Sequence, residues 1–220
     1  HLSTKVTAVR DGRVIAEHEG EQLEIPFDKL LVSVGRRAVT DGLGLETVGV
    51  ELQRGAIVVD EHLETSVPGI YAVGDVNGVS MLAHTAAREG QVAVHHITDY
   101  PDAMSYRAIP GIVYTDPEIA SVGKTEQELR TAGVDYQVHR VPMSLSGRFV
   151  IENEQGNGFC KLLTDSEGVI LGAHMLGNGS SEILVPAIMA VEQRMTLTEL
   201  ARIVFPHPTV CEIVRSATLH

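Results

Sequence analysis

Near the end of the chain, a histidine and a glutamate stand at a spacing that could support acid–base chemistry. His207 lies between Pro206 and Pro208, and Glu212 follows five residues later. Histidine is the side chain that gains and loses a proton near neutral pH, and a carboxylate can hold its imidazole in one tautomer. The flanking prolines restrict the backbone and would hold the ring rigidly. We therefore take His207 and Glu212 as candidate catalytic residues.

The same glutamate has a second, purely structural interpretation. Thr209 precedes Glu212 by three residues, which is the spacing of a capping box at the start of a helix. In that arrangement the carboxylate of Glu212 binds a backbone N–H group and not the imidazole. Both interpretations stay open on the sequence alone.

A second candidate site lies where an apolar run ends on a glycine and a carboxylate. The run 70–75 predicts a strand that ends on Gly74 and Asp75. Gly74 lacks a Cβ, so a ligand could approach the backbone there, and an ionised Asp75 accepts hydrogen bonds from hydroxyl groups. Taken alone, Gly-Asp after a strand is more often a turn or a helix cap.

Four residues at the head of a predicted helix could face the same ligand. Small and apolar side chains recur at helical spacing over residues 83–97, which predicts a helix. The four residues at its start are Met81, Leu82, Ala83 and His84. Free N–H groups and the positive end of the helix dipole favour electron-rich or anionic atoms. The alternative is that Met81 and Leu82 belong to the core and that His84 is a packed polar residue.

Metal chemistry and disulfide chemistry find little support in the sequence. The two cysteines, Cys160 and Cys211, are too far apart for a C-x-x-C pair, and the other histidines lack metal-ligand spacing with carboxylates or thiols. We predict no metal site and assign no role to Cys211. Two free cysteines suit a reducing cytoplasm, which is the expected location.

The composition is that of a soluble globular protein of 220 residues with a formal net charge of −12. Neutralising phosphates requires clustered Lys and Arg, so nucleic acid is not an expected partner. No apolar run approaches the roughly 18 residues of a membrane span, and none resembles a signal peptide. Because the chain lacks an initiator Met and opens directly on a strand-like pattern, we expect its start to be an internal cut.

Patterns along the chain divide it into two unlike units, with no fixed-period repeat. The first unit predicts a hairpin turning at Asp11-Gly12, a strand buried on both faces at 30–34, and strands at 57–59 and 70–75. The strand at 30–34 ends at Gly35, a candidate cofactor-binding residue because a ligand could approach the backbone there. After a boundary loop at 100–102, the second unit predicts an α+β domain. Its expected strands are 134–141, 159–163 and 169–176; its expected helices begin at Thr125, at Ser180 or Ser181 with a kink from Pro186, and at Thr196.

Three of these motifs resemble one family, the FAD-dependent pyridine nucleotide–disulfide oxidoreductases. Residues 65–76 resemble its second flavin fingerprint, in which the carboxylate at the position of Asp75 binds the ribityl chain of FAD. Residues 81–84 resemble the dihydrolipoamide dehydrogenases within that family, and residues 205–212 resemble its His-Pro-Thr-x-x-Glu signature. Residues 31–37, 114–118 and 171–182 also match, so the resemblance covers essentially the whole chain.

The resemblance implies a fold, two cofactors and two partners. The fold class is α/β: the C-terminal part of a doubly wound FAD/NAD-binding domain followed by an α+β dimerisation (interface) domain. Its expected parts are the end of the NAD-binding domain at 1–40, a second segment of the FAD-binding domain at 41–108, and the interface domain at 109–220. A homodimer, FAD, NAD and the lipoyl domains of 2-oxo acid dehydrogenase complexes are implied in the same way, and so is a cis bond before Pro208.

Departures from the family pattern qualify the expected activity. Neither G-x-G-x-x-G phosphate-binding turn nor a C-x-x-x-x-C redox pair is present, and Phe205 and Pro206 stand where the family usually has His-Ala. We therefore expect a parent enzyme that oxidises dihydrolipoamide with NAD, while these residues alone are inactive. The alternatives are a parent resembling glutathione or mercuric reductase, a purely structural dimerisation module, or an unrelated α/β binding protein.

Overall fold

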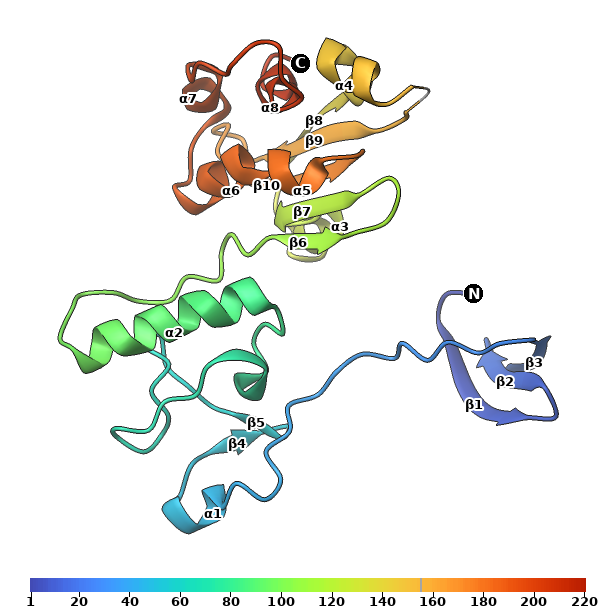
Figure 1. Cartoon of the computed structure of the whole chain (residues 1–220), viewed down its shortest axis with the longest axis vertical. Coiled ribbons are helices and arrows are strands. Elements are labelled where there is room, and N and C mark those ends of the chain that lie inside the picture. The colour runs from blue at the N-terminus through green and yellow to red at the C-terminus, as the bar shows by residue number, and fades with distance from the viewer. Residues whose placement is uncertain (155) are drawn as a thin grey trace.

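The computed structural model describes residues 1–154 and 156–220. Three lobes follow one another along the chain (Figure 1). A small β meander at the N-terminus is joined by an extended segment to a lobe built around one long helix, and a larger sheet-and-helix lobe completes the chain. No helix among the described residues is both long and apolar enough to cross a membrane.

The N-terminal lobe is a three-stranded antiparallel sheet. Its strands are β1 (Thr4–Arg10), β2 (Arg13–His18) and β3 (Glu21–Pro26), in that order across the sheet. Asp11 and Gly12 both have positive φ, 51° and 70°, so they form the tight turn between β1 and β2 that the sequence predicts.

The strand predicted at 30–34 is not formed. These residues run through the extended segment, and Leu31 and Val34 are 89% and 91% exposed. A strand buried on both faces needs hydrogen-bonding neighbours and apolar layers above and below it. No described strand lies alongside this segment, so its apolar pattern has nothing to pack against. Gly35 follows it, exposed and with a φ of 102°.

The middle lobe packs short elements against one long helix. The predicted helix is confirmed as α2 (Ala83–Ile97), and the buried side chains Val92 and Ala93 on its inner face join Leu63 and Met104 in a small core. Full burial of a side chain such as Val92 is worth about 1.5–3 kcal/mol. The other elements are α1 (Leu45–Val48), β4 (Leu52–Gln53), β5 (Ala56–Ile57) and the 3₁₀ helix η1 (Gly74–Asn77).

The strand predicted at 70–75 is replaced by an isolated bridge and a 3₁₀ turn. Among the described residues, Tyr71 forms a single bridge, to Glu64, and the chain turns into η1 at Gly74. The N–H group of Gly74 donates to the buried carboxylate of Glu89 on α2, at 2.5 Å. Since that N–H group is taken by a side chain, it cannot continue a strand ladder. The predicted strand at 57–59 is likewise shorter, because β5 ends at Ile57 and Val59 makes only one bridge, to Thr65.

The boundary loop at 100–102 is tied back to α2 by Asp102. Its carboxylate accepts two hydrogen bonds from Arg88, at 2.6 and 2.7 Å, and lies 2.7 Å from Nδ1 of His95. The bonds from Arg88 and then from His95 lower the pKa of Asp102 well below its usual range. His95 is thus a packed polar residue that helps to hold the connection between the middle and C-terminal lobes.

The C-terminal lobe is an α+β unit built on a five-stranded antiparallel sheet of order β6-β7-β10-β9-β8. The strands are β6 (Gly111–Val113), β7 (Ile119–Gly123), β8 (Gln137–Pro142), β9 (Phe159–Thr164) and β10 (Ile170–Leu176). The helices are α3 (Glu126–Thr131), the 3₁₀ helix η2 (Met143–Leu145), α4 (Gly147–Glu152), α5 (Ser180–Ile183), α6 (Val185–Glu192), α7 (Leu197–Ala201) and α8 (Glu212–Ala217). The strands predicted in this lobe are confirmed, with β8 beginning three residues later than expected.

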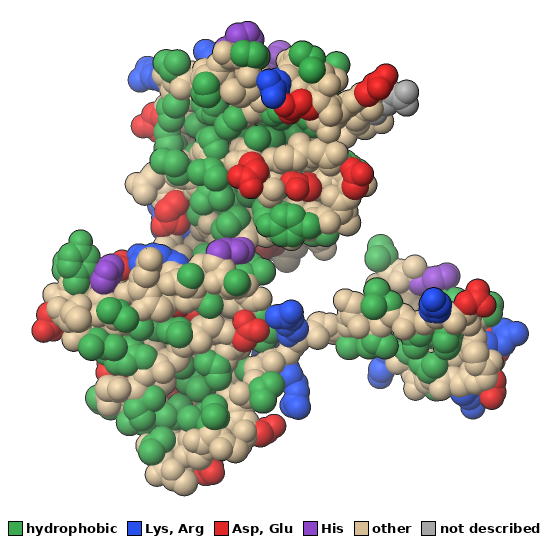
Figure 2. Space-filling view, in the orientation of Figure 1, with side chains coloured by type: hydrophobic (Ala, Val, Ile, Leu, Met, Phe, Trp, Pro, Cys, Tyr) green, Lys and Arg blue, Asp and Glu red, His purple; other side chains and the backbone are tan. Residues whose placement is uncertain are grey.

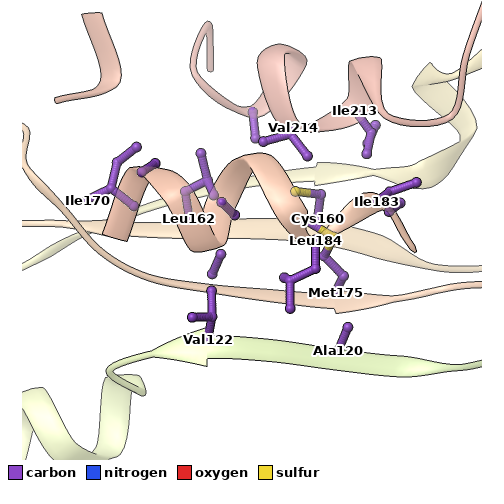
Figure 3. Packing of buried hydrophobic residues seen from close by; sticks show 14 of the residues in the cluster. Ala120, Val122, Cys160, Leu162, Ile170, Met175, Ile183, Leu184, Ile213 and Val214 are labelled. Carbon is purple, nitrogen blue, oxygen red and sulfur yellow. The ribbon is translucent and has the colours of Figure 1, made fainter. Parts of the chain in front are cut away.

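One large core holds this lobe together (Figure 3). Side chains from β9 and β10, such as Leu162 and Met175, meet Leu184 beside α5 and α6 and Ile213 and Val214 on α8. All five are at most 1% exposed. The helix carrying Glu212 is therefore anchored in the core of this lobe.

All three predicted helix starts in this lobe are confirmed, but only two of the three predicted caps are. Thr125 and Thr196 form complete capping boxes with Glu128 and Glu199. Ser180 does not cap its helix: Gly179 is the N-cap, and the Ser180 hydroxyl donates to the carbonyl oxygen of Gly177 at 2.6 Å. The predicted long helix is split into α5 and α6 at Leu184, and Pro186 lies in the first turn of α6, where its missing N–H group costs nothing.

Candidate active site and cofactor-binding turn

The side chains of His207 and Glu212 lie against each other. Nδ1 of His207 is 3.1 Å from both carboxylate oxygens of Glu212. An ionised carboxylate accepts a proton donor, so this contact favours the tautomer with hydrogen on Nδ1 and leaves Nε2 free to accept a proton. The imidazole is 81% exposed, so a substrate can reach Nε2.

The loop carrying His207 is held at several points. The His207–Pro208 peptide bond is cis, as the resemblance implies. The hydroxyl of Thr209 donates to the carbonyl oxygen of Pro206 at 2.8 Å, and the carbonyl oxygen of Thr209 accepts from the buried hydroxyl of Ser146 at 3.2 Å. These bonds join the loop to α4, while α8 joins it to the core, so the dyad lies on a fixed support.

Glu212 satisfies both interpretations that the sequence left open, each in part. One of its carboxylate oxygens accepts from the backbone N–H of Thr209 at 2.9 Å while the same carboxylate contacts His207. The reciprocal half of a capping box is missing, because the Thr209 hydroxyl is turned toward Pro206 and Cys211 is the N-cap of α8. The Thr209 amide, and then His207, lower the pKa of Glu212, so the carboxylate is ionised at neutral pH.

In the middle lobe, Gly74 and Asp75 form a sharp turn against α2. Gly74 has a φ of 78°, and a Cβ at this position would lie 3.3 Å from the Cβ of Ala86. The turn therefore needs glycine both for its conformation and for the close approach of the helix. Asp75 follows with its side chain 52% exposed, and its carboxylate lies 3.6 Å from the guanidinium of Arg36.

Glu89, which the sequence analysis did not single out, accepts hydrogen bonds from this turn on its buried side. Its side chain is fully buried and accepts hydrogen bonds from Gly74, from the Nδ2 group of Asn77 at 3.0 Å and from the hydroxyl of Tyr106 at 2.7 Å. One signal was available: Glu89 falls three and four residues before Val92 and Ala93, on the buried stripe of α2. A carboxylate on an apolar helix face requires partners.

The head of α2 lies beside the turn. Leu82 is its N-cap without a side-chain bond, so the first N–H groups of the helix lack helical partners. Met81 is partly buried, while Leu82, Ala83 and His84 are exposed. A ring nitrogen of His84 lies 2.9 Å from the carbonyl oxygen of Pro110, so this histidine links the helix head to the start of the C-terminal lobe.

A cavity of about 520 Å³ opens next to these residues. Arg36, Arg37 and Arg54 line it together with Asn77 and Met81. Figure 2 shows Lys and Arg side chains where the extended segment meets the middle lobe. An acceptor on Asp75, a glycine turn, free helix N–H groups and cationic side chains together suit a ligand that carries both hydroxyl and phosphate groups.

The structure brings the candidate residues together in two separate places. Gly74, Asp75 and residues 81–84 gather around the start of α2, with Gly35 next to Arg36, which reaches Asp75. His207 and Glu212 lie in the C-terminal lobe at the start of α8 (Figure 1). Within one chain, the predicted cofactor residues and the predicted catalytic residues belong to different lobes.

The two thiols are poorly suited to redox chemistry where they stand. Burial raises the pKa of Cys160 to about 12, and burial followed by the charge of Glu212 raises the pKa of Cys211. A thiol reacts as its thiolate, so both are unreactive near neutral pH. Across residues 1–154 and 156–220, no three His, Cys, Asp or Glu side chains are grouped so that they could hold a metal ion.

Family models match both parts of the chain. Residues 1–90 match the model described as "Pyridine nucleotide-disulphide oxidoreductase", and residues 109–218 match its "dimerisation domain". The predicted fold class, an α/β FAD/NAD-binding part followed by an α+β dimerisation domain, agrees with these matches and is confirmed.

Curated relatives and solved structures agree with the family models. Dihydrolipoyl dehydrogenase of Geobacillus stearothermophilus is 42% identical over 93% of this chain and 44% of its own length, and the mitochondrial enzyme of Caenorhabditis elegans is 39% identical over 99% and 46%. LpdA from Mycobacterium tuberculosis superposes with a TM-score of 0.79 at 30% identity, over 99% of this chain and 47% of that one. The flavoprotein disulfide reductase RclA from Escherichia coli, in its Cu(II) complex, gives 0.80 at 26%, over 96% and 48%.

This chain spans about half the length of the curated relatives that it matches. The likeness nevertheless runs through both matched regions, which together hold the glycine turn, the helix head and the His207–Glu212 pair. The chain belongs to the pyridine nucleotide-disulphide oxidoreductase family.

Proposed function

We propose that these residues are part of a dihydrolipoyl dehydrogenase, an enzyme that oxidises dihydrolipoamide with NAD through FAD and a redox disulfide. The relatives named above that carry this activity support the assignment. The observation that carries it is the His207–Glu212 dyad, in which the imidazole is oriented by a carboxylate at 3.1 Å and offers an exposed Nε2.

The dyad suits proton transfer with a dithiol substrate. Disulfide exchange begins with a thiolate, and a thiol loses its proton slowly without a nearby base. His207 Nε2 would take that proton, and the ionised Glu212 would stabilise the resulting imidazolium. Because Cys160 and Cys211 are unreactive in their positions, the redox disulfide would have to come from residues outside these 220. We therefore expect the 220-residue chain to be inactive by itself.

We propose that Gly74, Asp75 and residues 81–84 contact FAD, with Gly35 and Arg36 at the edge of the same site. When bound, FAD supplies two-electron transfer between a dithiol and NAD. Asp75 would accept hydrogen bonds from the hydroxyl groups of the cofactor, and the N–H groups at the head of α2 would face its electron-rich atoms. The cavity beside Arg36, Arg37 and Arg54 would accept phosphate groups.

We further propose that residues 109–220 form a homodimer. Val185 and Met189 on α6 and Val204 after α7 are each at least half exposed. Together with Pro206, which precedes His207 in the chain, they line an apolar groove of about 290 Å³. Apolar side chains also gather over α6 and α7 in Figure 2. A partner covering this groove would lie beside the exposed imidazole.

The same proposal covers the protein partners that supply the substrate, the cellular location and the division into domains. Lipoyl domains of 2-oxo acid dehydrogenase complexes would deliver the dithiol, and the expected compartment is the cytoplasm. In the domain division that we propose, residues 1–40 end an NAD-binding domain, residues 41–108 form a segment of an FAD-binding domain, and residues 109–220 form the interface domain.

The first test is a visible absorption spectrum of the purified chain after incubation with excess FAD and removal of unbound cofactor. A retained flavin band would support the proposed cofactor site, and its loss in Asp75→Ala would assign the band to that site. A colourless wild-type chain would mean that these residues do not hold FAD unaided.

Activity is tested in a chimera that joins this chain to the complementary half of the Geobacillus stearothermophilus relative. We expect flavin-containing chimera to reduce NAD with dihydrolipoamide, and His207→Gln to lower the rate about 100-fold or more, as for loss of a general base. A chimera that binds FAD but reduces glutathione disulfide and not lipoamide would favour the glutathione reductase alternative. Failure with both substrates would favour a purely structural role in dimerisation.

A further inference from the structure

The buried side of the cofactor-binding turn carries a carboxylate that the proposed chemistry does not use. Glu89 is fully buried in a lobe whose other core residues around α2 are mostly apolar. Burying a carboxylate is costly unless its oxygens are hydrogen-bonded. Its three donors come from two different segments: Gly74 and Asn77 in the η1 turn, and Tyr106 in the connection to the C-terminal lobe.

Two of these three bonds hold the turn itself. Glu89 Oε2 accepts the N–H of Gly74 at 2.5 Å and Nδ2 of Asn77 at 3.0 Å, so one oxygen binds the first and last residues of η1. Asn77 in turn accepts the N–H of Val79 at 3.0 Å through its Oδ1 atom. The chain from Gly74 to Val79 is thereby fixed to the middle of α2.

Asp75 lies between the two bound residues, and none of the described residues gives its side chain comparable support. Its contact with Arg36 is 3.6 Å long and exposed on both sides, and such a pair contributes little to a fixed geometry. The position of the Asp75 carboxylate is therefore determined mainly by the backbone of η1. That backbone is held by Glu89.

The other oxygen of Glu89 extends the same support to the connection between lobes. Oε1 accepts from the hydroxyl of Tyr106 at 2.7 Å. Burial, followed by this bond to Glu89, raises the pKa of Tyr106, so its hydroxyl keeps the proton that it donates. Tyr106 precedes the C-terminal lobe, so the network joins that connection to the turn.

We propose that Glu89 is a positioning residue: its buried carboxylate fixes the Gly74–Asn77 turn and thereby presents Asp75 to the cofactor. The proposal rests on the assignment of Asp75 to FAD binding. Glu89 itself lies beneath the turn and does not touch the ligand. Its contribution is the acceptor geometry, which a neutral amide oxygen can reproduce.

The test compares three variants of the full 220-residue chain by FAD affinity and by thermal unfolding. Glu89→Ala removes the acceptor, and Glu89→Gln keeps one oxygen for Gly74 and Asn77 while its amide can donate to the hydroxyl oxygen of Tyr106. Val92→Ala is the matched control, since Val92 is equally buried on the same helix face and lies in the apolar cluster, away from the turn.

We expect Glu89→Ala to weaken FAD binding about 10-fold or more, and Glu89→Gln to stay within about 3-fold, by the usual cost of losing a positioned hydrogen bond. Val92→Ala should lower the unfolding temperature without changing the affinity of the folded protein. Equal FAD affinity in wild type and Glu89→Ala, or equal losses in Glu89→Ala and Val92→Ala, would overturn the proposal.

Hydrogen exchange at the Gly74 amide separates this proposal from the proposed cofactor site. We expect that amide to be protected in wild type and Glu89→Gln and to exchange about 10-fold or more faster in Glu89→Ala, again by the loss of one buried bond. If the wild-type chain binds no FAD, these residues do not hold the cofactor unaided, and the exchange rates alone decide whether Glu89 holds the turn. Unchanged protection in Glu89→Ala would refute it.

Discussion

At the scale of single residues, the carboxylate of Glu212 has two donors, and they contribute differently. The Thr209 amide is fixed by the loop, while the His207 imidazole is 81% exposed. The amide is the larger cause of the lowered pKa of Glu212. The Thr209 amide therefore holds the Glu212 carboxylate in place, and the carboxylate orients the imidazole from that fixed position.

Because the Thr209 amide is the larger cause, the pKa of Glu212 should stay low in a variant that lacks the imidazole. In His207→Gln, we expect the pKa of Glu212 to remain below the ordinary glutamate value of about 4.3, because the Thr209 amide still donates to it. The titration is measured from the side-chain carboxyl carbon by ¹³C NMR. A return to the ordinary value would show that the imidazole holds the carboxylate.

The sign of the associated pH dependence follows from the lowered pKa. A group whose pKa is lower in the folded state stabilises the fold above its unfolded pKa, and that contribution is lost as pH falls through the folded value. Glu212, Glu128 and Glu199 all have lowered pKa values, and in the latter two a backbone amide is again the largest cause. All three contributions disappear on acidification below the ordinary glutamate range.

At the scale of elements, short helices depend on their caps. α7 has only five residues, far fewer than an isolated helix needs in water. Its first turn is completed by Thr196, whose hydroxyl accepts from the Glu199 amide at 3.2 Å while the Glu199 carboxylate accepts from the Thr196 amide at 2.7 Å. Leu200 then fixes the helix in the main core.

Removing this cap should destabilise the protein measurably. We expect Thr196→Ala to lower the free energy of unfolding by about 1 kcal/mol at neutral pH, the usual value of a lost N-cap. The measurement is urea denaturation followed by circular dichroism. Thr198→Ala, at an exposed position of the same helix, is the control and should change it by less than about 0.5 kcal/mol. Equal effects of the two substitutions would contradict the role of the cap.

At the scale of the whole molecule, the apolar groove beside His207 is the feature that the single chain leaves unexplained. Val204, which is 92% exposed, and Met189 on α6 both line it. Isolated exposed apolar side chains are common, but a contiguous groove of this kind marks an interaction surface. A second copy of the chain is the proposed occupant.

A charge in this groove should separate the subunits. We expect Val204→Asp to convert a dimer into a monomer at micromolar concentration, because it places an unpaired carboxylate in a buried interface. Light scattering measures the molar mass. Val9→Asp, at an exposed position on β1 in the N-terminal lobe, is the matched control and should remain dimeric. A dimeric Val204→Asp would move the interface elsewhere, and a monomeric wild type would remove the proposal.

Local patterns determined much of this protein. The boundaries of α2, the hairpin at Asp11-Gly12, the two complete capping boxes and the strands β9 and β10 could all be predicted, since each depends on residues close in sequence. The resemblance of three short motifs was enough to identify the family. The contact of His207 with Glu212 was one of two predicted possibilities.

Only the tertiary structure decided the rest, and the reason is the distance along the chain between partners. The apolar pattern of residues 30–34 predicts a buried strand, but burial depends on neighbouring strands and helices that no local pattern specifies. No such neighbours cover this segment among the described residues. Gly74 turns out of the predicted strand, and its N–H group bonds to Glu89, fifteen residues away. A buried carboxylate, its donors and the turn that they hold exist only once α2 has packed.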